Sequence, residues 1–149
     1  MEKAVDRIAA SGKASPLGLA IWKARYCLES SAYDKACKLL SDWYRTLYSG
    51  EQRWLADKIA EQSLYEFIFH FCPDCKGAGD MMINDLKVSC GTCTGSRLKR
   101  YSDKERCSRM KVSWAMTKAV SRKLQRTMSK IFDEDGLVSY QMSIELERN

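Results

Sequence analysis

The spacing of apolar residues predicts amphipathic helices in the first half of the chain. The first helix starts at Ser15-Pro16, because serine is a favourable N-cap and the fixed φ of proline suits a first turn. Apolar residues then recur on one helical face, at Leu17, Ala20, Ile21, Ala24 and Leu28.

Two further helices are predicted before the first pair of cysteines. Ser31 with Asp34 resembles a capping box, and the helix that follows ends at Ser49-Gly50. The third helix runs from about Glu51 to Ile68. Joined by short turns, the three helices predict a small bundle over residues 1–71. We expect its aromatic side chains to form core rather than a ligand site, namely Trp22, Trp43, Trp54, Tyr65, Phe67, Phe69 and Phe71.

Beyond residue 96 the pattern predicts a helix, a turn and a second helix. Ser102 is a favourable N-cap for a short helix that extends to Met110. Ser113 can cap a second helix, from Trp114 to Phe132. The residues with the spacing expected between two steeply crossing helices are Cys107, Met110, Val112 and Val120.

The end of the chain alternates apolar and polar residues. The apolar series is Val138, Tyr140, Met142, Ile144 and Leu146. This alternation predicts a strand, after the run Asp133-Glu134-Asp135-Gly136 has ended the helix. A solitary strand needs an edge to pair with, in this chain or another.

Length and composition favour a single globular unit. The chain has 149 residues and is 45% hydrophobic, enough for the core of about one domain. It has no run of about 18 apolar residues, and its first residues lack the apolar stretch of a secretory signal. We therefore expect a cytoplasmic, mainly α protein with no membrane contact. Its predicted parts are a helical bundle (1–71), a cysteine segment (72–96) and a basic segment with a tail (97–149).

Charge is concentrated in one part of the chain. Residues 1–96 carry twelve basic and twelve acidic side chains, whereas residues 97–130 carry twelve basic against two acidic, a net charge of +10. A surface that faces polyphosphate needs such a concentration of charge, since each neutralised phosphate releases counterions. Solvated helix faces are also often basic, so the charge alone leaves both interpretations open.

Four of the seven cysteines form two matched motifs. Cys72-x-x-Cys75-x-Gly and Cys90-x-x-Cys93-x-Gly flank a predicted hairpin that turns at Asn84-Asp85. Each pair can place two sulfurs on one tetrahedral ion, with glycine permitting the positive φ that the turn requires. We therefore predict one structural Zn²⁺ held by four thiolates, with a thiol redox role as the rival interpretation.

The remaining cysteines and the single histidine suggest no catalysis. Cys27, Cys37 and Cys107 fall in helical patterns and are expected to be small core residues. His70 lies two residues before Cys72, and because the four-cysteine set is already complete we expect it to be a partly buried residue at a helix end. Neither a serine–histidine nor a cysteine–histidine arrangement is plausible there, and no glycine-rich phosphate loop occurs. No enzymatic activity is predicted.

The basic segment and the predicted helix-turn-helix coincide, which favours double-stranded DNA as the partner. In that motif the second helix enters the major groove by its N-terminus. The candidate DNA contacts are Arg97, Lys99, Arg100, Arg109, Lys111, Ser113, Trp114, Thr117, Lys118, Ser121 and Arg122. A plain surface helix pair and a binder of single-stranded RNA that uses Trp114 for stacking are the alternatives.

These motifs resemble those of the Q-type transcription antitermination proteins of lambdoid phages. The similar residues are the two cysteine motifs, the second of the form Cys-Gly-x-Cys-x-Gly, and Pro16-Leu17-Gly18-Leu19-Ala20 near the start of the bundle. The second motif departs from the family at Arg97, where a glycine is common. Co-chaperones of the DnaJ type carry similar cysteine units, usually in fours.

The resemblance implies a late-gene regulator in a bacterial or phage-infected cell. Such a protein binds a DNA element beside a promoter, loads onto bacterial RNA polymerase holoenzyme with its sigma factor, and lets the enzyme pass terminators. The alternative is a zinc-ribbon adaptor that binds protein, similar to a co-chaperone, without DNA specificity.

Overall fold

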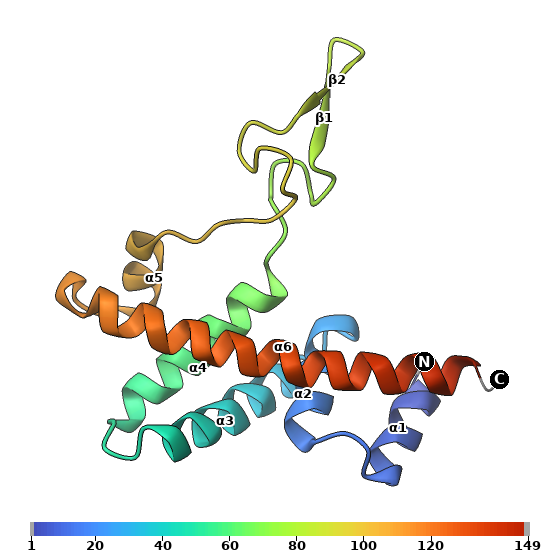
Figure 1. Cartoon of the computed structure of the whole chain (residues 1–149), viewed down its shortest axis with the longest axis vertical. Coiled ribbons are helices and arrows are strands. Elements are labelled where there is room, and N and C mark those ends of the chain that lie inside the picture. Colours follow the sequence, from blue (N-terminus) through green and yellow to red (C-terminus); the bar gives the residue numbers. More distant parts are fainter. Residues whose placement is uncertain (1, 148–149) are drawn as a thin grey trace.

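The computed structural model describes residues 2–147 and is mainly helical, as predicted (Figure 1). No helix in this range is long and apolar enough to cross a membrane. In chain order the elements are α1 (Glu2–Ser11), α2 (Pro16–Tyr26), α3 (Ser30–Leu47), α4 (Arg53–Ile68), β1 (Asp80–Ile83), β2 (Leu86–Ser89), α5 (Asp103–Met110), the 3₁₀ turn η1 (Trp114–Met116) and α6 (Thr117–Glu147).

The N-cap residues predicted for the first helices are only partly correct. The Ser15 side chain accepts a hydrogen bond from the Gly18 amide, which confirms the predicted start of α2. The predicted capping box at Ser31 is wrong, because the N-cap of α3 is Glu29, two residues earlier, and it makes no side-chain hydrogen bond. The sequence interpretation also missed α1, whose Val5 and Ile8 are buried.

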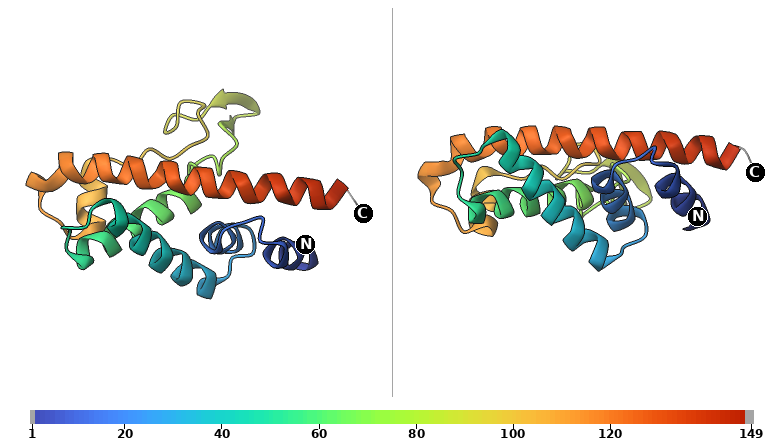
Figure 2. Two further views of the ribbon diagram at one scale, coloured as in Figure 1. Left: turned by 60° about the horizontal axis from the view of Figure 1, so that its bottom comes forward. Right: turned by 90° about the horizontal axis from the view of Figure 1, so that it is seen from below.

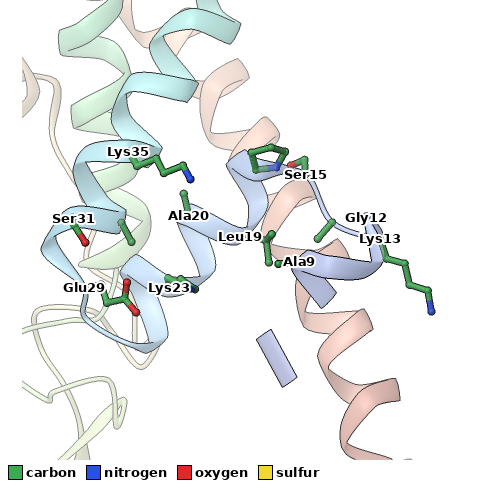
Figure 3. A pocket seen from close by; sticks show the side chains of 13 residues that line it. Ala9, Gly12, Lys13, Ser15, Leu19, Ala20, Lys23, Glu29, Ser31 and Lys35 are labelled. Atoms are coloured by element: carbon green, nitrogen blue, oxygen red, sulfur yellow. The ribbon is translucent and has the colours of Figure 1, made fainter. Parts of the chain in front are cut away.

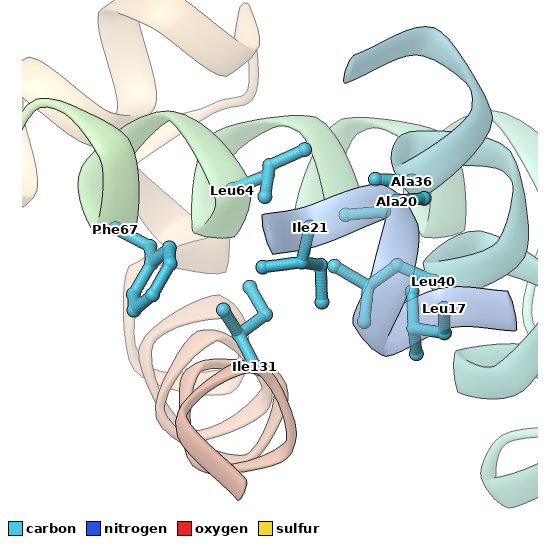
Figure 4. Close-up of a cluster of buried hydrophobic side chains, with 9 residues drawn as sticks. Leu17, Ala20, Ile21, Ala36, Leu40, Leu64, Phe67 and Ile131 are labelled. Atoms are coloured by element: carbon cyan, nitrogen blue, oxygen red, sulfur yellow. The ribbon is translucent and has the colours of Figure 1, made fainter. Parts of the chain in front are cut away.

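Helix α6 runs along the whole bundle and contributes to each of its hydrophobic clusters (Figure 2). Ile131 packs with residues of α2, α3 and α4, as Figure 4 shows. Leu124 joins the cluster of α3, α4 and α5, while Val138 and Met142 join that of α1 and α2. One helix therefore connects all three clusters.

The predicted strand at the end of the chain is wrong, because α6 continues to Glu147. Ile131, Val138 and Met142 lie on one helical face and are all buried, so a continuous helix places all three side chains in the core. Tyr140 and Leu146, which also belong to the alternating series, are 63% and 59% exposed. The predicted helix end before Gly136 is wrong for the same reason.

The predicted hairpin is confirmed and stands away from the bundle (Figure 1). Ile83 pairs with Leu86 across a two-residue turn, in which Asn84 and Asp85 both have positive φ. The alternation of strand side chains places four apolar residues on one face of the sheet, Met81, Ile83, Leu86 and Val88, all of them exposed. This apolar hairpin face has no packing partner within residues 2–147.

The aromatic residues divide between core and surface, which corrects the expectation that all would be core. Trp22 and Phe67 are buried. Trp54, Phe69 and Phe71 are exposed, by 45%, 53% and 55%. The two phenylalanines lie where α4 has ended and the chain leaves the bundle, so fewer elements cover them.

Replacement of Gly136 by alanine tests the continuity of α6. No atom lies within 4 Å of the position that a Cβ would occupy, and the residue sits inside a helix. We expect the free energy of unfolding, measured in urea, to rise by about 0.5–1 kcal/mol. A decrease would indicate that the chain turns at Gly136 and that the helix is interrupted there.

Candidate metal centre and nucleic-acid interface

Four buried sulfurs meet at the base of the cysteine hairpin, which we define as residues 72–96. The Sγ atoms of Cys72, Cys75, Cys90 and Cys93 all lie within 4.8 Å of one another. Sγ of Cys72 is 3.9 Å from that of Cys90, and Sγ of Cys75 is 3.7 Å from that of Cys93. A tetrahedral ion with metal–sulfur distances of about 2.3 Å requires sulfur separations of about 3.8 Å. The cluster therefore fits a single divalent metal ion.

The backbone of the first cysteine motif turns an amide toward sulfur, and glycines of both motifs form the turns. The Gly79 amide donates a hydrogen bond to Sγ of Cys75, and Gly77, Gly79 and Gly95 all have positive φ, as predicted for the turns. A Cβ on Gly77 would lie 2.9 Å from the ring of Phe71. Glycine is therefore required here both for the backbone angle and for space.

Burial and hydrogen bonds act in opposite directions on the thiols. Burial opposes ionisation of Cys75, but the Gly79 amide, the Cys93 sulfur and the Gly77 amide together lower its pKa to about 7. The Cys75 amide favours the Cys72 thiolate, yet burial and the neighbouring sulfurs raise the pKa of Cys72 to about 11. A bound cation offsets the burial of four such groups, and its binding releases the protons that remain.

Arg97 takes the backbone position that glycine has in the first motif. Arg97 and Gly79 each lie four residues after the second cysteine of their motif, and their φ angles are +67° and +86°. An arginine in this left-handed conformation costs about 1 kcal/mol relative to glycine. The chain tolerates this cost at a position that presents an exposed guanidinium.

A short stem joins the cysteine hairpin to the bundle. The amide of Cys72 donates to the carbonyl of Arg97, and the amide of Lys99 donates to the carbonyl of His70. Nδ1 of His70 lies 2.7 Å from the carbonyl oxygen of Phe67, and the ring is half-buried and apart from the sulfur cluster, as predicted. The cysteine hairpin therefore fixes the start of the segment that leads to α5.

A buried polar network fixes α5 against α4. The guanidinium of Arg106 donates two hydrogen bonds of 2.7 Å to the carboxylate of Glu66, which is 5% exposed. Gln62 donates to the same carboxylate and accepts from Arg109, whose guanidinium carbon is 3.5 Å from the centre of the Tyr65 ring. Two parallel hydrogen bonds between arginine and a carboxylate set orientation as well as distance, so α5 is held in one position.

Lys111 forms the turn between α5 and η1. It is the C-cap of α5 in the left-handed conformation, with φ +53°, and its amide donates to carbonyls of α5. The N-cap predicted at Ser102 is confirmed, and Glu105 completes a capping box with it. Met110 is buried, and Val112 packs beside it on the cluster that contains Val120.

The outer face of α6 begins with a stripe of cations. Lys118, Arg122 and Arg126 are spaced four residues apart, opposite the buried face that contains Val120 and Leu124. All three side chains are exposed, and none makes an ion pair within residues 2–147. Successive charges on this stripe rise by about 6 Å along the helix axis.

The other predicted DNA contacts do not all reach this surface. Arg97, Arg100, Lys111, Ser113 and Trp114 are exposed, with Trp114 at 66%. Lys99 is paired with Glu105, and Ser121 donates to Asp103. Thr117, a predicted DNA contact, is buried instead, and its hydroxyl donates to the carbonyl of Trp114.

Two exposed cations and one buried acid were missed in the sequence. Lys104 and Arg126 are exposed and unpaired in residues 2–147, and helical spacing from Lys118 would have indicated Arg126. Glu66, which binds Arg106, lies 40 residues before it in the chain, and no sequence pattern near either residue indicates that they pair.

Comparisons with protein-family models, with curated proteins and with solved structures find no match for this chain.

Replacement of Cys93 by serine tests the metal centre. We expect the purified protein to contain one equivalent of a divalent metal ion, and the variant to lose it together with the order of the hairpin. Metal analysis and nuclear magnetic resonance of residues 72–96 measure both effects. The control is replacement of Cys37 by serine, because Cys37 lies outside the cluster, and this variant should retain the metal. A Cys93 variant that keeps metal and hairpin would contradict the ligand set.

Replacement of Glu66 by alanine tests the anchoring of α5. The free energy of unfolding should fall by about 2 kcal/mol, less than for a fully buried ion pair because the Arg106 side chain is 25% exposed. Alanine at Glu61, exposed on the same helix, should change stability by less than about 0.5 kcal/mol. Equal effects of the two replacements in urea denaturation would show that the network does not anchor α5.

Proposed function

We propose that this protein is a transcription antitermination factor of the Q type, which binds promoter-proximal DNA and RNA polymerase. The observation that carries the proposal is the combination of a four-cysteine cluster with an exposed cationic stripe on the helix that follows an anchored α5 and a tight turn. The motifs that resemble the antitermination family are the same residues that build the cluster.

The ion proposed for the cluster is Zn²⁺, in a structural role. Four thiolates in tetrahedral arrangement are the usual set for structural zinc. Such a set leaves no coordination position for water or substrate, which supports a protein without enzymatic activity. Cys72, Cys75, Cys90 and Cys93 would hold the ion, and the ion would keep the hairpin and its stem folded.

The DNA-binding surface is proposed on α5, the turn and the first half of α6, arranged as a helix-turn-helix. Burial removes Thr117 from the proposed contacts. Contacts inside the protein occupy Ser121, Lys99 and Arg109. The remaining contacts are exposed: phosphates are assigned to Arg97, Arg100, Lys104, Lys111, Arg122 and Arg126, and base edges to Ser113, Trp114 and Lys118.

The proposed protein partner is bacterial RNA polymerase holoenzyme, in the cytoplasm of the host. An exposed apolar face, formed by Met81, Ile83, Leu86 and Val88 on an isolated two-stranded hairpin, supports contact with a protein. The same face supports the second candidate function, a zinc-ribbon adaptor that binds protein without DNA specificity. The response of DNA affinity to salt distinguishes the two candidates.

Replacement of Arg122 by alanine tests DNA binding. Affinity for duplex DNA should fall steeply with added salt, and the variant should reduce the slope of log affinity against log salt by about 1. Fluorescence anisotropy with a labelled duplex measures this slope. The matched control is replacement of Lys38, which is exposed on α3, by alanine. Affinity that does not respond to salt would favour the adaptor.

A terminator read-through assay then tests antitermination itself. With a matching promoter and purified polymerase, the wild-type protein should increase transcription past a terminator, and the Arg122 variant should do so less. Salt-dependent DNA binding without read-through would retain the DNA-binding proposal and exclude antitermination.

A further inference from the structure

The N-terminal helices enclose an open groove far from the cationic stripe of α6. The groove has a volume of about 930 Å³ and is lined by the end of α1, the loop before α2, one face of α2 and the start of α3 (Figure 3). Neither the metal cluster nor any of the proposed DNA contacts borders it. The functions proposed above leave this groove unused.

The floor of the groove is apolar and built mostly from small side chains. Its apolar lining consists of Ala9, Ala14, Pro16, Leu19, Ala20 and Ala32. Small side chains allow the backbone of another helix to approach closely. A partner gains free energy by covering this apolar surface only if it has an apolar face of its own, so a fully polar ligand is disfavoured. A nucleic-acid backbone has no apolar face of this kind to bury, so the floor favours a protein.

The rim of the groove carries an excess of positive charge. Lys13, Lys23 and Lys35 border it, against the single acidic residue Glu29. None of these four side chains makes an ion pair within residues 2–147. Figure 3 shows Lys23 and Lys35 on either side of Ala20, so that two cations flank the apolar floor.

We propose that this groove binds an acidic amphipathic helix of a protein partner. The apolar face of such a helix would contact the floor near Ala20 and Leu19, while its carboxylates would pair with Lys23 and Lys35. The proposal is independent of DNA binding, because it uses other helices and other cations.

Binding of defined peptides to the full-length protein tests the proposal. The probe is a labelled helical peptide of about four turns, with leucine and alanine on one face and glutamate on the other. One control peptide carries lysine in place of glutamate, and a second has the acidic composition with its apolar residues spread around the helix. We expect saturable binding of the first peptide, and binding at least about tenfold weaker for the controls.

Variants locate the binding site. The double replacement Lys23→Glu and Lys35→Glu should weaken binding of the acidic peptide about tenfold, whereas Lys38→Glu, a like change on α3 outside the groove, should not. Ala9→Trp, at an exposed position, should block the floor without disturbing the core. Circular dichroism verifies that each variant is folded.

Three results would overturn the proposal. One is equal binding of all three peptides, and another is an equal effect of the Lys38 variant. The third is loss of duplex-DNA affinity in the double variant with peptide binding unchanged, which would make the groove part of a nucleic-acid surface. Failure of the Arg122 variant to alter DNA binding would contradict the proposed function and leave this proposal standing.

Discussion

The buried face of α6 is the constraint on which the arrangement of the molecule depends. Leu124, Ile131 and Val138 belong to three different hydrophobic clusters, and each is almost fully buried. Burial of one such side chain contributes about 2 kcal/mol, so the helix is held along most of its length. Because the inner positions pack in the core, the outer positions can carry charge without disturbing that packing.

The twelve basic residues between Arg97 and Lys130 serve two purposes. Lys99, Arg106 and Lys123 form ion pairs between segments, and Arg109 is held by Gln62 and Tyr65, so these four fix elements against one another. Lys130 pairs with Glu134 within α6. Seven others are exposed and unpaired within residues 2–147. Net charge alone does not distinguish the two groups, whereas the position of each residue relative to a buried acid such as Glu66 does.

Local signals made the cysteine hairpin predictable, and the lack of such signals explains most of the errors. Both cysteine motifs, the turn at Asn84-Asp85 and the cap at Ser102 depend on residues a few positions apart, and all were predicted. The end of α6 was not, because alternation over a few residues also suits a helix whose buried positions fall at Val138 and Met142. The Glu66–Arg106 pair and the burial of Thr117 depend on contacts between distant segments, which spacing cannot report.

The length of α6 has a geometric consequence. Its 31 residues span about 46 Å without interruption, with the cations near one end and the contacts to α1 near the other. Whatever binds at the two ends is therefore held at a set separation and at a set angle around the helix axis. One residue inserted midway would lengthen the helix by about 1.5 Å but turn one end by about 100° relative to the other. The relative rotation of the two ends is therefore more sensitive to an insertion than their separation.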